Sequence, residues 1–190
     1  CGDYVDMSTF FEPGRLEGKK TMGFEIFEFF GENLPDYILY PTGGGTGLVG
    51  IWKAFAELRA MGVLGASTSL PKLVAVQSEN CSPVVDAFLN KQLEVHPVVS
   101  KGTKADGLNV PGAIMGHGIL KALDESQGLA IAISEAAITG TFESLNAQGI
   151  SVSYESAATI AAAKDLRQKQ VIPKGSSALA LFTSGLLTSL

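Results

Sequence analysis

Short apolar runs alternate with stretches of helical periodicity along this chain, and the alternation limits the folds that are open to it. Each run is apolar nearly throughout and is bounded by turn residues, which is typical of parallel strands covered on both faces. The predicted strands occupy residues 36–40, 72–77, 129–134 and 178–182, with a weaker candidate at 94–99.

Between these runs, apolar residues recur at spacings of three and four, as they do on one face of an α-helix. The predicted helices occupy residues 18–31, 46–62, 82–90, 134–149 and 156–169. Such an alternation predicts an α/β fold, a parallel twisted sheet with helices on both faces. The glycine-rich stretch 100–118 is predicted to be a long ordered loop, a feature that in such domains often belongs to a site.

Composition excludes several classes of protein. With 46% hydrophobic and 17% charged residues, the chain can build a globular core. The net charge of −5 and the scattered basic residues argue against nucleic-acid binding, and no apolar run reaches the roughly 18 residues that span a bilayer. Two cysteines do not indicate a disulfide scaffold or a zinc site, and His96 and His117 are isolated. We therefore expect no metal centre and a cytoplasmic location.

Residues 43–47 include four glycines, between a predicted strand and a predicted helix. In open α/β sheets, ligands bind beyond the carboxyl ends of the strands, which is where this segment falls. The first turn of a helix has unpaired N–H groups and the positive end of the helix dipole. Glycines let such N–H groups converge without side chains in the way. A phosphate group is therefore the expected ligand.

Three interpretations of these glycines stay open at this point. A tight strand-to-helix turn rarely needs four of them. Gly45, Gly47 and Gly50 fit the dinucleotide pattern GxGxxG, but no acidic residue follows about 20 positions later to bind a ribose. A Walker A loop is excluded because no Lys-Ser or Lys-Thr pair follows at the required offset. A cradle for a single phosphomonoester, such as that of pyridoxal phosphate, is the favoured interpretation.

Several segments together resemble threonine synthase, which belongs to the fold-type II group of pyridoxal phosphate enzymes. The matching stretches are, in order, "RLEGKKTMGFEI", "LPDYILYPTGGGTGLVGIWKAF", "VAVQSENCSP", "TKADGLNVPGAIMGHGILKAL", "YESAATIAAAKDL" and "LFTSGL". They cover nearly the whole chain at family-like spacings. The resemblance implies the large domain of such an enzyme, with pyridoxal 5′-phosphate as the cofactor.

The resemblance also implies which residues contact that cofactor. The phosphate cradle would be formed by the backbone N–H groups of Gly43, Gly44, Gly45 and Thr46, flanked by Thr42 and Gly47. Thr183 would donate a hydrogen bond from its hydroxyl to the pyridine nitrogen, without forcing that nitrogen to be protonated. Ser184 is a second candidate, because "TSGLL" departs from the glycine-rich ending usual in the family.

For the substrate, the resemblance implies a phosphorylated amino acid. Arg15, in "RLEG", matches an arginine suited to gripping the phosphate of O-phosphohomoserine, since a guanidinium binds phosphate through two parallel hydrogen bonds. A surface ion pair with Glu12 or Glu17 is the alternative for Arg15. Glu17 itself would lie near the cofactor; its alternative is a charge that complements a helix dipole.

The implied reaction converts O-phosphohomoserine and water to threonine and phosphate. A threonine or serine dehydratase, a cysteate synthase and a non-catalytic fragment are the alternatives. The lysine that forms a Schiff base with the cofactor is expected in an "SFKD"-like segment, and the chain contains no such segment.

Residues 1–190 are therefore interpreted as the C-terminal part of the enzyme, mainly its large cofactor-binding domain. The small domain and the lysine segment would be missing, and the chain alone would be inactive. The expected partners are the small-molecule substrate, the N-terminal half of the enzyme and a second copy in a homodimer, with neither nucleic acid nor membrane.

Overall fold

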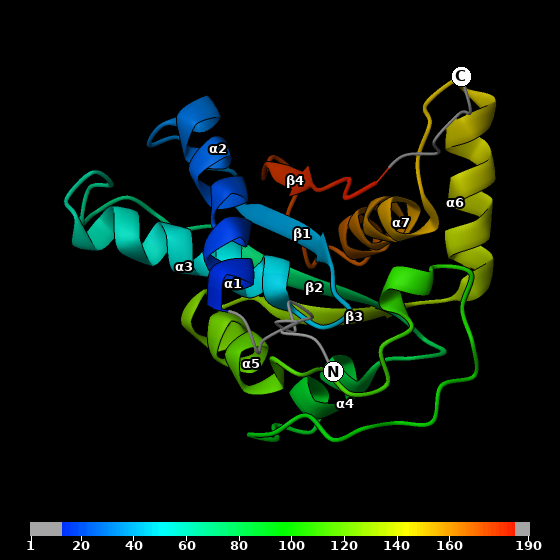
Figure 1. Cartoon of the computed structure of the whole chain (residues 1–190). Helices are drawn as coiled ribbons and strands as arrows, with labels where there is room; N and C mark the ends of the chain where they lie inside the picture. Colours follow the sequence, from blue (N-terminus) through cyan, green and yellow to red (C-terminus); the bar gives the residue numbers. More distant parts are fainter. Residues whose placement is uncertain (1–12, 185–190) are drawn as a thin grey trace, which may run out of the picture.

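The computed structural model describes residues 13–184 (Figure 1). In chain order the elements are α1 (Pro13–Lys19), α2 (Thr21–Phe30), β1 (Tyr37–Pro41), α3 (Thr46–Ala60), β2 (Lys72–Ser78), α4 (Pro83–Leu89), the 3-10 helix η2 (Asp106–Leu108), α5 (Gly116–Glu125), β3 (Leu129–Ile133), α6 (Glu135–Ala147), α7 (Tyr154–Gln168) and β4 (Ala178–Ala180). Within this range, no helix is both long enough and apolar enough to cross a membrane.

The four strands form one parallel sheet in the order β3-β2-β1-β4. Strand β1 lies inside the sheet, with Tyr37 opposite Lys72 of β2 on one side and opposite Ala178 of β4 on the other. The β2–β3 pairing places Val74 opposite Leu129. All of β1 is buried, as expected for a parallel strand that is covered on both faces.

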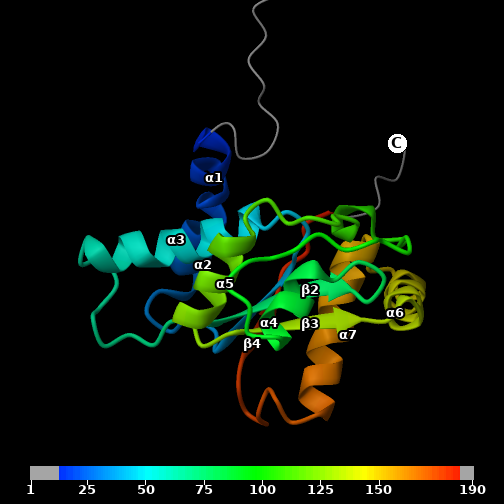
Figure 2. The same ribbon diagram turned by 90° about the horizontal axis from the view of Figure 1, so that it is seen from below.

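Helices cover both faces of the sheet, so the predicted α/β architecture is confirmed (Figures 1 and 2). Successive β1 side chains point to opposite faces. Ile38 and Tyr40 join a core that includes side chains from α2, α3 and α5. Tyr37 and Leu39 join a second core, built mainly with α7.

The five predicted helices are present, with ends that shift by a few residues. The stretch predicted as one helix at 18–31 contains the end of α1 and all of α2. Helices α6 and α7 each begin after a serine: the hydroxyl oxygens of Ser134 and Ser153 accept the N–H groups of Ala137 and Ser156, both at 3.2 Å. These side-chain caps satisfy donors that the helix itself cannot pair.

For the segment after α4, one prediction is wrong and the range of another is shortened. Residues 94–99 form no strand: Val99 is 92% exposed, and the N–H of Val98 donates to the carbonyl of Pro111 in an irregular contact (2.9 Å). The loop predicted at 100–118 contains η2 and ends early, because α5 begins at Gly116.

Candidate functional site

The glycine loop connects the carboxyl end of β1 to the first turn of α3. Strand β1 ends at Pro41 and α3 begins at Thr46, so residues 42–45 make the whole connection. Because β1 lies between β2 and β4, this connection sits at the carboxyl edge of the sheet and away from its flanks. That edge is where ligands bind in open α/β sheets.

The backbone N–H groups that follow Thr42 in the loop have no hydrogen-bond acceptor within the described part of the chain. The first bond of α3 runs from the N–H of Val49 to the carbonyl of Gly45 (3.0 Å), and no side chain caps the helix. Within residues 13–184, the N–H groups of residues 43–48 donate no hydrogen bond. Several of these residues are buried, and a buried N–H without a partner is costly. The loop therefore presents a group of donors, at the positive end of a helix dipole, that an anion would satisfy.

Close packing explains part of the glycine content. A Cβ on Gly43 would lie 2.3 Å from the carbonyl oxygen of Gly107, and one on Gly47 would lie 2.0 Å from the Tyr40 hydroxyl. Gly45 has a φ of 95°, a conformation that other residues rarely adopt. The tight-turn interpretation thus accounts for these three glycines. It does not account for the unpaired N–H groups, which favour the phosphate cradle.

Thr42 is fully buried and its groups are used inside the protein. Its hydroxyl donates to the carbonyl of Tyr40 (2.9 Å), and its N–H donates to the carbonyl of Val76 (2.8 Å). Its own carbonyl accepts the side-chain N–H of Gln77 (3.0 Å), whose side-chain oxygen accepts the N–H of Val84 (2.9 Å). Thr42 therefore anchors the loop, whereas Thr46, at the start of α3, is half-buried, and its contact with a ligand stays a prediction.

The role of Gln77 is not predicted by the sequence. This fully buried side chain fastens the start of the glycine loop to the start of α4. The available signal is one amide side chain at the end of the predicted strand "KLVAVQ", directly after the apolar residues 73–76. A buried polar residue of that kind is expected to be hydrogen-bonded, although its partners cannot be read from the pattern.

Thr183 and Ser184 follow β4, at the same edge of the sheet as the glycine loop. Leu181 extends the β1–β4 pairing by donating its N–H to the carbonyl of Leu39 (3.1 Å). The carbonyl of Ser184 accepts the Ser156 hydroxyl (2.9 Å), which ties this segment to α7. Both hydroxyl-bearing residues are exposed.

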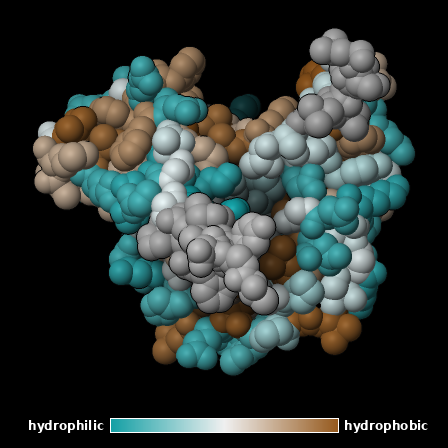
Figure 3. All heavy atoms as spheres, viewed as in Figure 1, coloured by the Kyte–Doolittle hydropathy of each residue, from teal (hydrophilic) through white to brown (hydrophobic). Residues whose placement is uncertain are grey.

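Thr183 lines a cavity of about 460 Å³ beside α2, β1 and β4. Phe29 of α2 and Phe182 also line this cavity, so much of its wall is apolar. The space-filling view shows the surface hollowed between the side that carries α2 and α3 and the side that carries α6 (Figure 3).

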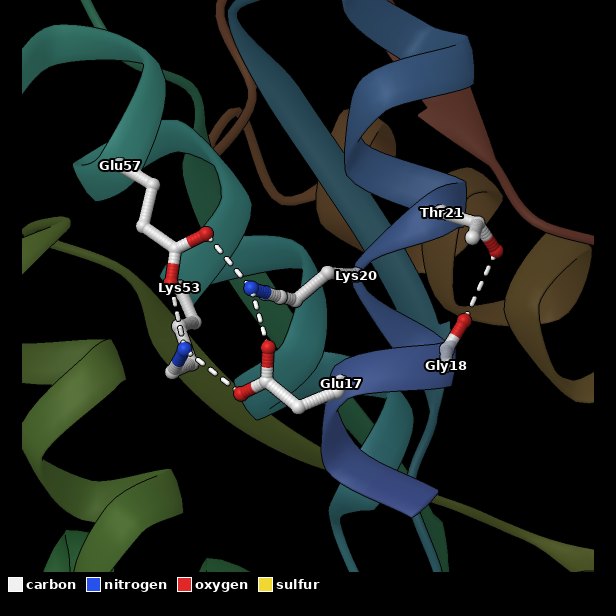
Figure 4. Close-up of polar contacts among 6 residues, drawn as sticks. All are labelled: Glu17, Gly18, Lys20, Thr21, Lys53 and Glu57. Carbon is white, nitrogen blue, oxygen red and sulfur yellow. Dashed lines mark hydrogen bonds and ion pairs between the residues drawn. The ribbon is translucent and has the colours of Figure 1, made fainter. Parts of the chain in front are cut away.

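Glu17 belongs to an ion-pair cluster that joins α1 to α3 (Figure 4). Lys53 pairs with Glu17 (2.8 Å) and Lys20 pairs with Glu57 (2.6 Å), while Lys20–Glu17 and Lys53–Glu57 contacts close the cluster. Hydrogen bonds from Lys20 and then Lys53 lower the pKa of Glu17. The carboxylate of Glu17 thus forms ion pairs with two ammonium groups, and its role near the cofactor stays a prediction.

Arg15 is exposed on the same helix, α1. This helix approaches α3 closely, since a Cβ on Gly50 would lie 2.8 Å from the Cβ of Lys19. The fold therefore brings Arg15 and Glu17 to the helix that begins at the glycine loop, whereas Thr183 and Ser184 lie in the segment that follows β4. Within the described residues, no group of three or more His, Cys, Asp or Glu side chains could hold a metal ion.

The chain matches the family of pyridoxal-phosphate dependent enzymes over residues 2–184. It therefore belongs to that family, whose cofactor is pyridoxal 5′-phosphate.

The chain is also similar to individual members of this family. The chain is 31% identical to threonine synthase from Methanosarcina acetivorans, over 92% of its own length and 43% of the length of that enzyme. It thus spans less than half of this relative. Among solved structures, it resembles maize serine racemase (20% identity, TM-score 0.69, 93% of this chain and 50% of that chain) and the threonine deaminase of T.th. (22%, 0.68, 92% and 57%). These two likenesses concern the fold, which is that of fold-type II enzymes.

Proposed function

We propose that this chain forms the part of a pyridoxal phosphate enzyme that binds the cofactor phosphate and the cofactor ring. The observation that supports the proposal most directly is the group of unpaired N–H donors at residues 43–48, at the start of α3. Their chemistry fits a phosphate group, because several donors and the helix dipole act on one anion. The membership of the family supplies the identity of the group that carries this phosphate.

The other residues have matching roles in this proposal. The hydroxyl of Thr46 adds a donor to the cradle, and Thr183 or Ser184 donates a hydrogen bond to the ring nitrogen. A hydroxyl suits this position because it leaves the ring nitrogen unprotonated. When bound, the cofactor supplies the electron sink that the chemistry needs. This chain contributes orientation, through the cradle at one end and the hydroxyl at the other.

For the intact enzyme, we propose the conversion of O-phosphohomoserine and water to threonine and phosphate. The similarity to threonine synthase supports this choice. Arg15 would bind the substrate phosphate, and residues 1–190 would be the C-terminal part of the enzyme. The lysine that holds the cofactor would come from the part of the fold that lies outside this chain.

Cofactor binding by the chain can be tested without covalent chemistry. Pyridoxine 5′-phosphate and pyridoxine have no aldehyde, so neither reacts with surface lysines. Calorimetry is expected to show that the phosphorylated form binds at least about tenfold more tightly, the ratio that one charge-assisted phosphate contact supplies. Equal binding of the two compounds would show that the cradle assignment is wrong.

The reaction requires a reconstituted enzyme. The chain would be co-expressed with the part of the Methanosarcina acetivorans threonine synthase that the match does not cover. The complex would be given O-phosphohomoserine in one assay and threonine in another. Threonine and inorganic phosphate are the expected products. Production of a 2-oxo acid from threonine, with no phosphate released from O-phosphohomoserine, would instead favour the dehydratase alternative.

A further inference from the structure

Residues 103–110 form a wall against the glycine loop. The carbonyl of Gly107 and the side chain of Val110 lie so close to Gly43 that an added Cβ would come within 2.3 and 2.9 Å of them. Ala105 and Leu108 are fully buried, which fixes the middle of the segment in the core. The position of Gly43 therefore depends on where this segment is held.

Two glutamates from different helices hold the segment by its backbone. Glu135, the first residue of α6, accepts the N–H of Lys104 at 3.1 Å. Glu155, in the first turn of α7, accepts the N–H of Gly107 at 2.8 Å. Hydrogen bonds from an N–H to a carboxylate are among the stronger ones in proteins. The wall is thus attached at two points to two helices.

Glu135 is also connected to β2. The Ser78 hydroxyl donates to its carboxylate (2.5 Å), and the neighbouring Gln77 donates to the carbonyl of Thr42 (3.0 Å). The end of β2 therefore links the wall to the residue that opens the glycine loop. Burial raises the pKa of Glu135, but hydrogen bonds, with that from Ser78 the largest, outweigh it, so the pKa lies below its ordinary value.

We propose that Glu135 and Glu155 are positioning residues for the phosphate cradle. Their carboxylates contact the wall, and the wall keeps Gly43 in place, so that the unpaired N–H groups of the loop stay aligned for one anion. The inference rests on the proposed function in one respect: it takes phosphate as the ligand of the loop. The positioning itself is a property of the protein without ligand.

The test compares Glu155→Ala with Glu155→Gln and with the control Glu143→Ala, which removes an exposed glutamate of α6. In the ¹⁵N-labelled chain, amide order parameters of Gly43 and Gly107 report the positioning, and titration with inorganic phosphate gives the affinity. Glu155→Ala is expected to lower both order parameters from about 0.85 towards 0.6. It should also weaken phosphate binding by about tenfold, the scale of one hydrogen bond to a charged group.

Glu155→Gln is expected to rescue both quantities, because its amide oxygen can still accept the N–H of Gly107. If Glu155 were purely structural, Glu155→Ala would lower the free energy of unfolding but leave the phosphate affinity and the order parameters of the folded protein unchanged. That result would overturn the proposal. If Glu155→Ala does not fold, Glu155→Asp, whose carboxylate is one methylene shorter, replaces it. Absence of phosphate binding by the wild-type chain would refute the proposed function, while the order parameters would still decide on the positioning.

Discussion

Gly43→Ala tests the packing of the glycine loop against its wall. The added Cβ would lie 2.3 Å from the carbonyl oxygen of Gly107 and 2.9 Å from a methyl group of Val110. Contacts of a Cβ below 3.0 Å are essentially never seen. The distance from the added Cβ to the Gly107 oxygen must therefore grow from 2.3 to at least 3.0 Å, which requires one of the two segments to move by about 0.7 Å. The obstructing atom belongs to the backbone, and Glu155 holds that backbone in place.

The expected cost follows from two opposing effects. Overpacking a well-filled site costs about 1–3 kcal/mol. Replacing a glycine by alanine recovers roughly 0.4–1 kcal/mol, because the unfolded chain loses freedom. The two ranges combine to a net loss of between about 0 and 2.6 kcal/mol, so we expect Gly43→Ala to lower the free energy of unfolding by about 1.3 kcal/mol, the difference of their midpoints.

Urea denaturation of the purified chain measures this quantity, and Gly140→Ala is the matched control. Gly140 lies within α6, and a Cβ there would meet nothing within 4 Å. Alanine at that position should raise the free energy of unfolding by about 0.5–1 kcal/mol through helix propensity. If the two variants prove equally stable, the close approach of residues 43 and 107 is wrong, and with it the account of the wall.

Three further predictions concern the same network. Gly44→Asp should abolish phosphate binding, because it adds a negative charge beside the bound anion, while a cooperative thermal unfolding transition shows that the variant still folds. Unchanged phosphate affinity in a titration would contradict the assignment of the cradle. Gln77→Ala should lower the free energy of unfolding in urea by about 1–3 kcal/mol, since the carbonyl of Thr42 is left buried without a partner, whereas the exposed Gln92→Ala should change it by less than about 0.5 kcal/mol. The pKa of Glu135 is lowered in the folded state, so its contribution to stability is present above the ordinary value of 4.5 and is lost as the pH falls through the lower folded value. The stability of Glu135→Gln should therefore depend less on pH below 4.5, and an unaltered pH profile of urea unfolding would show that the carboxylate is not engaged.

The sheet could be predicted because its signal is local. The residues of β1 and β2 are buried by helices on both faces, so the apolar runs mark them directly. Ser134 also marks the start of α6 in the sequence, whereas the cap of α7 at Ser153 was not predicted, and this helix begins two residues before its expected start. The order of the strands depends on pairing between distant segments, and no single run encodes it.

The predicted strand at 94–99 and the predicted end of the loop at 118 differ from the structure, because contacts between distant residues override the local sequence pattern there. Residues 94–99 include three valines, a residue type that is frequent in strands, but the segment runs over the surface and pairs with no strand of the described chain. Helix α5 begins among glycines, because the start of this helix lies against Val95: a Cβ on Gly116 would come within 2.6 Å of the Cβ of Val95. That contact between distant residues cannot be read from the composition of "GAIMGHG".

For the candidate site, the sequence predicted the loop and the helix start, and the resemblance supplied the identity of the ligand. The network behind the loop was not predicted. Gln77, Glu135 and Glu155 act through contacts that span 35, 31 and 48 residues. Spacings of that length have no period that a sequence pattern could reveal.

Binding of one phosphate group by the N–H groups of residues 43–48 can be observed by titrating the ¹⁵N-labelled chain with inorganic phosphate and recording every backbone amide. We expect saturable shifts that are largest at residues 43–48, in wild-type protein but not in Gly44→Asp. Shifts of similar size across the surface, or shifts centred on exposed lysines away from the loop, would contradict this binding.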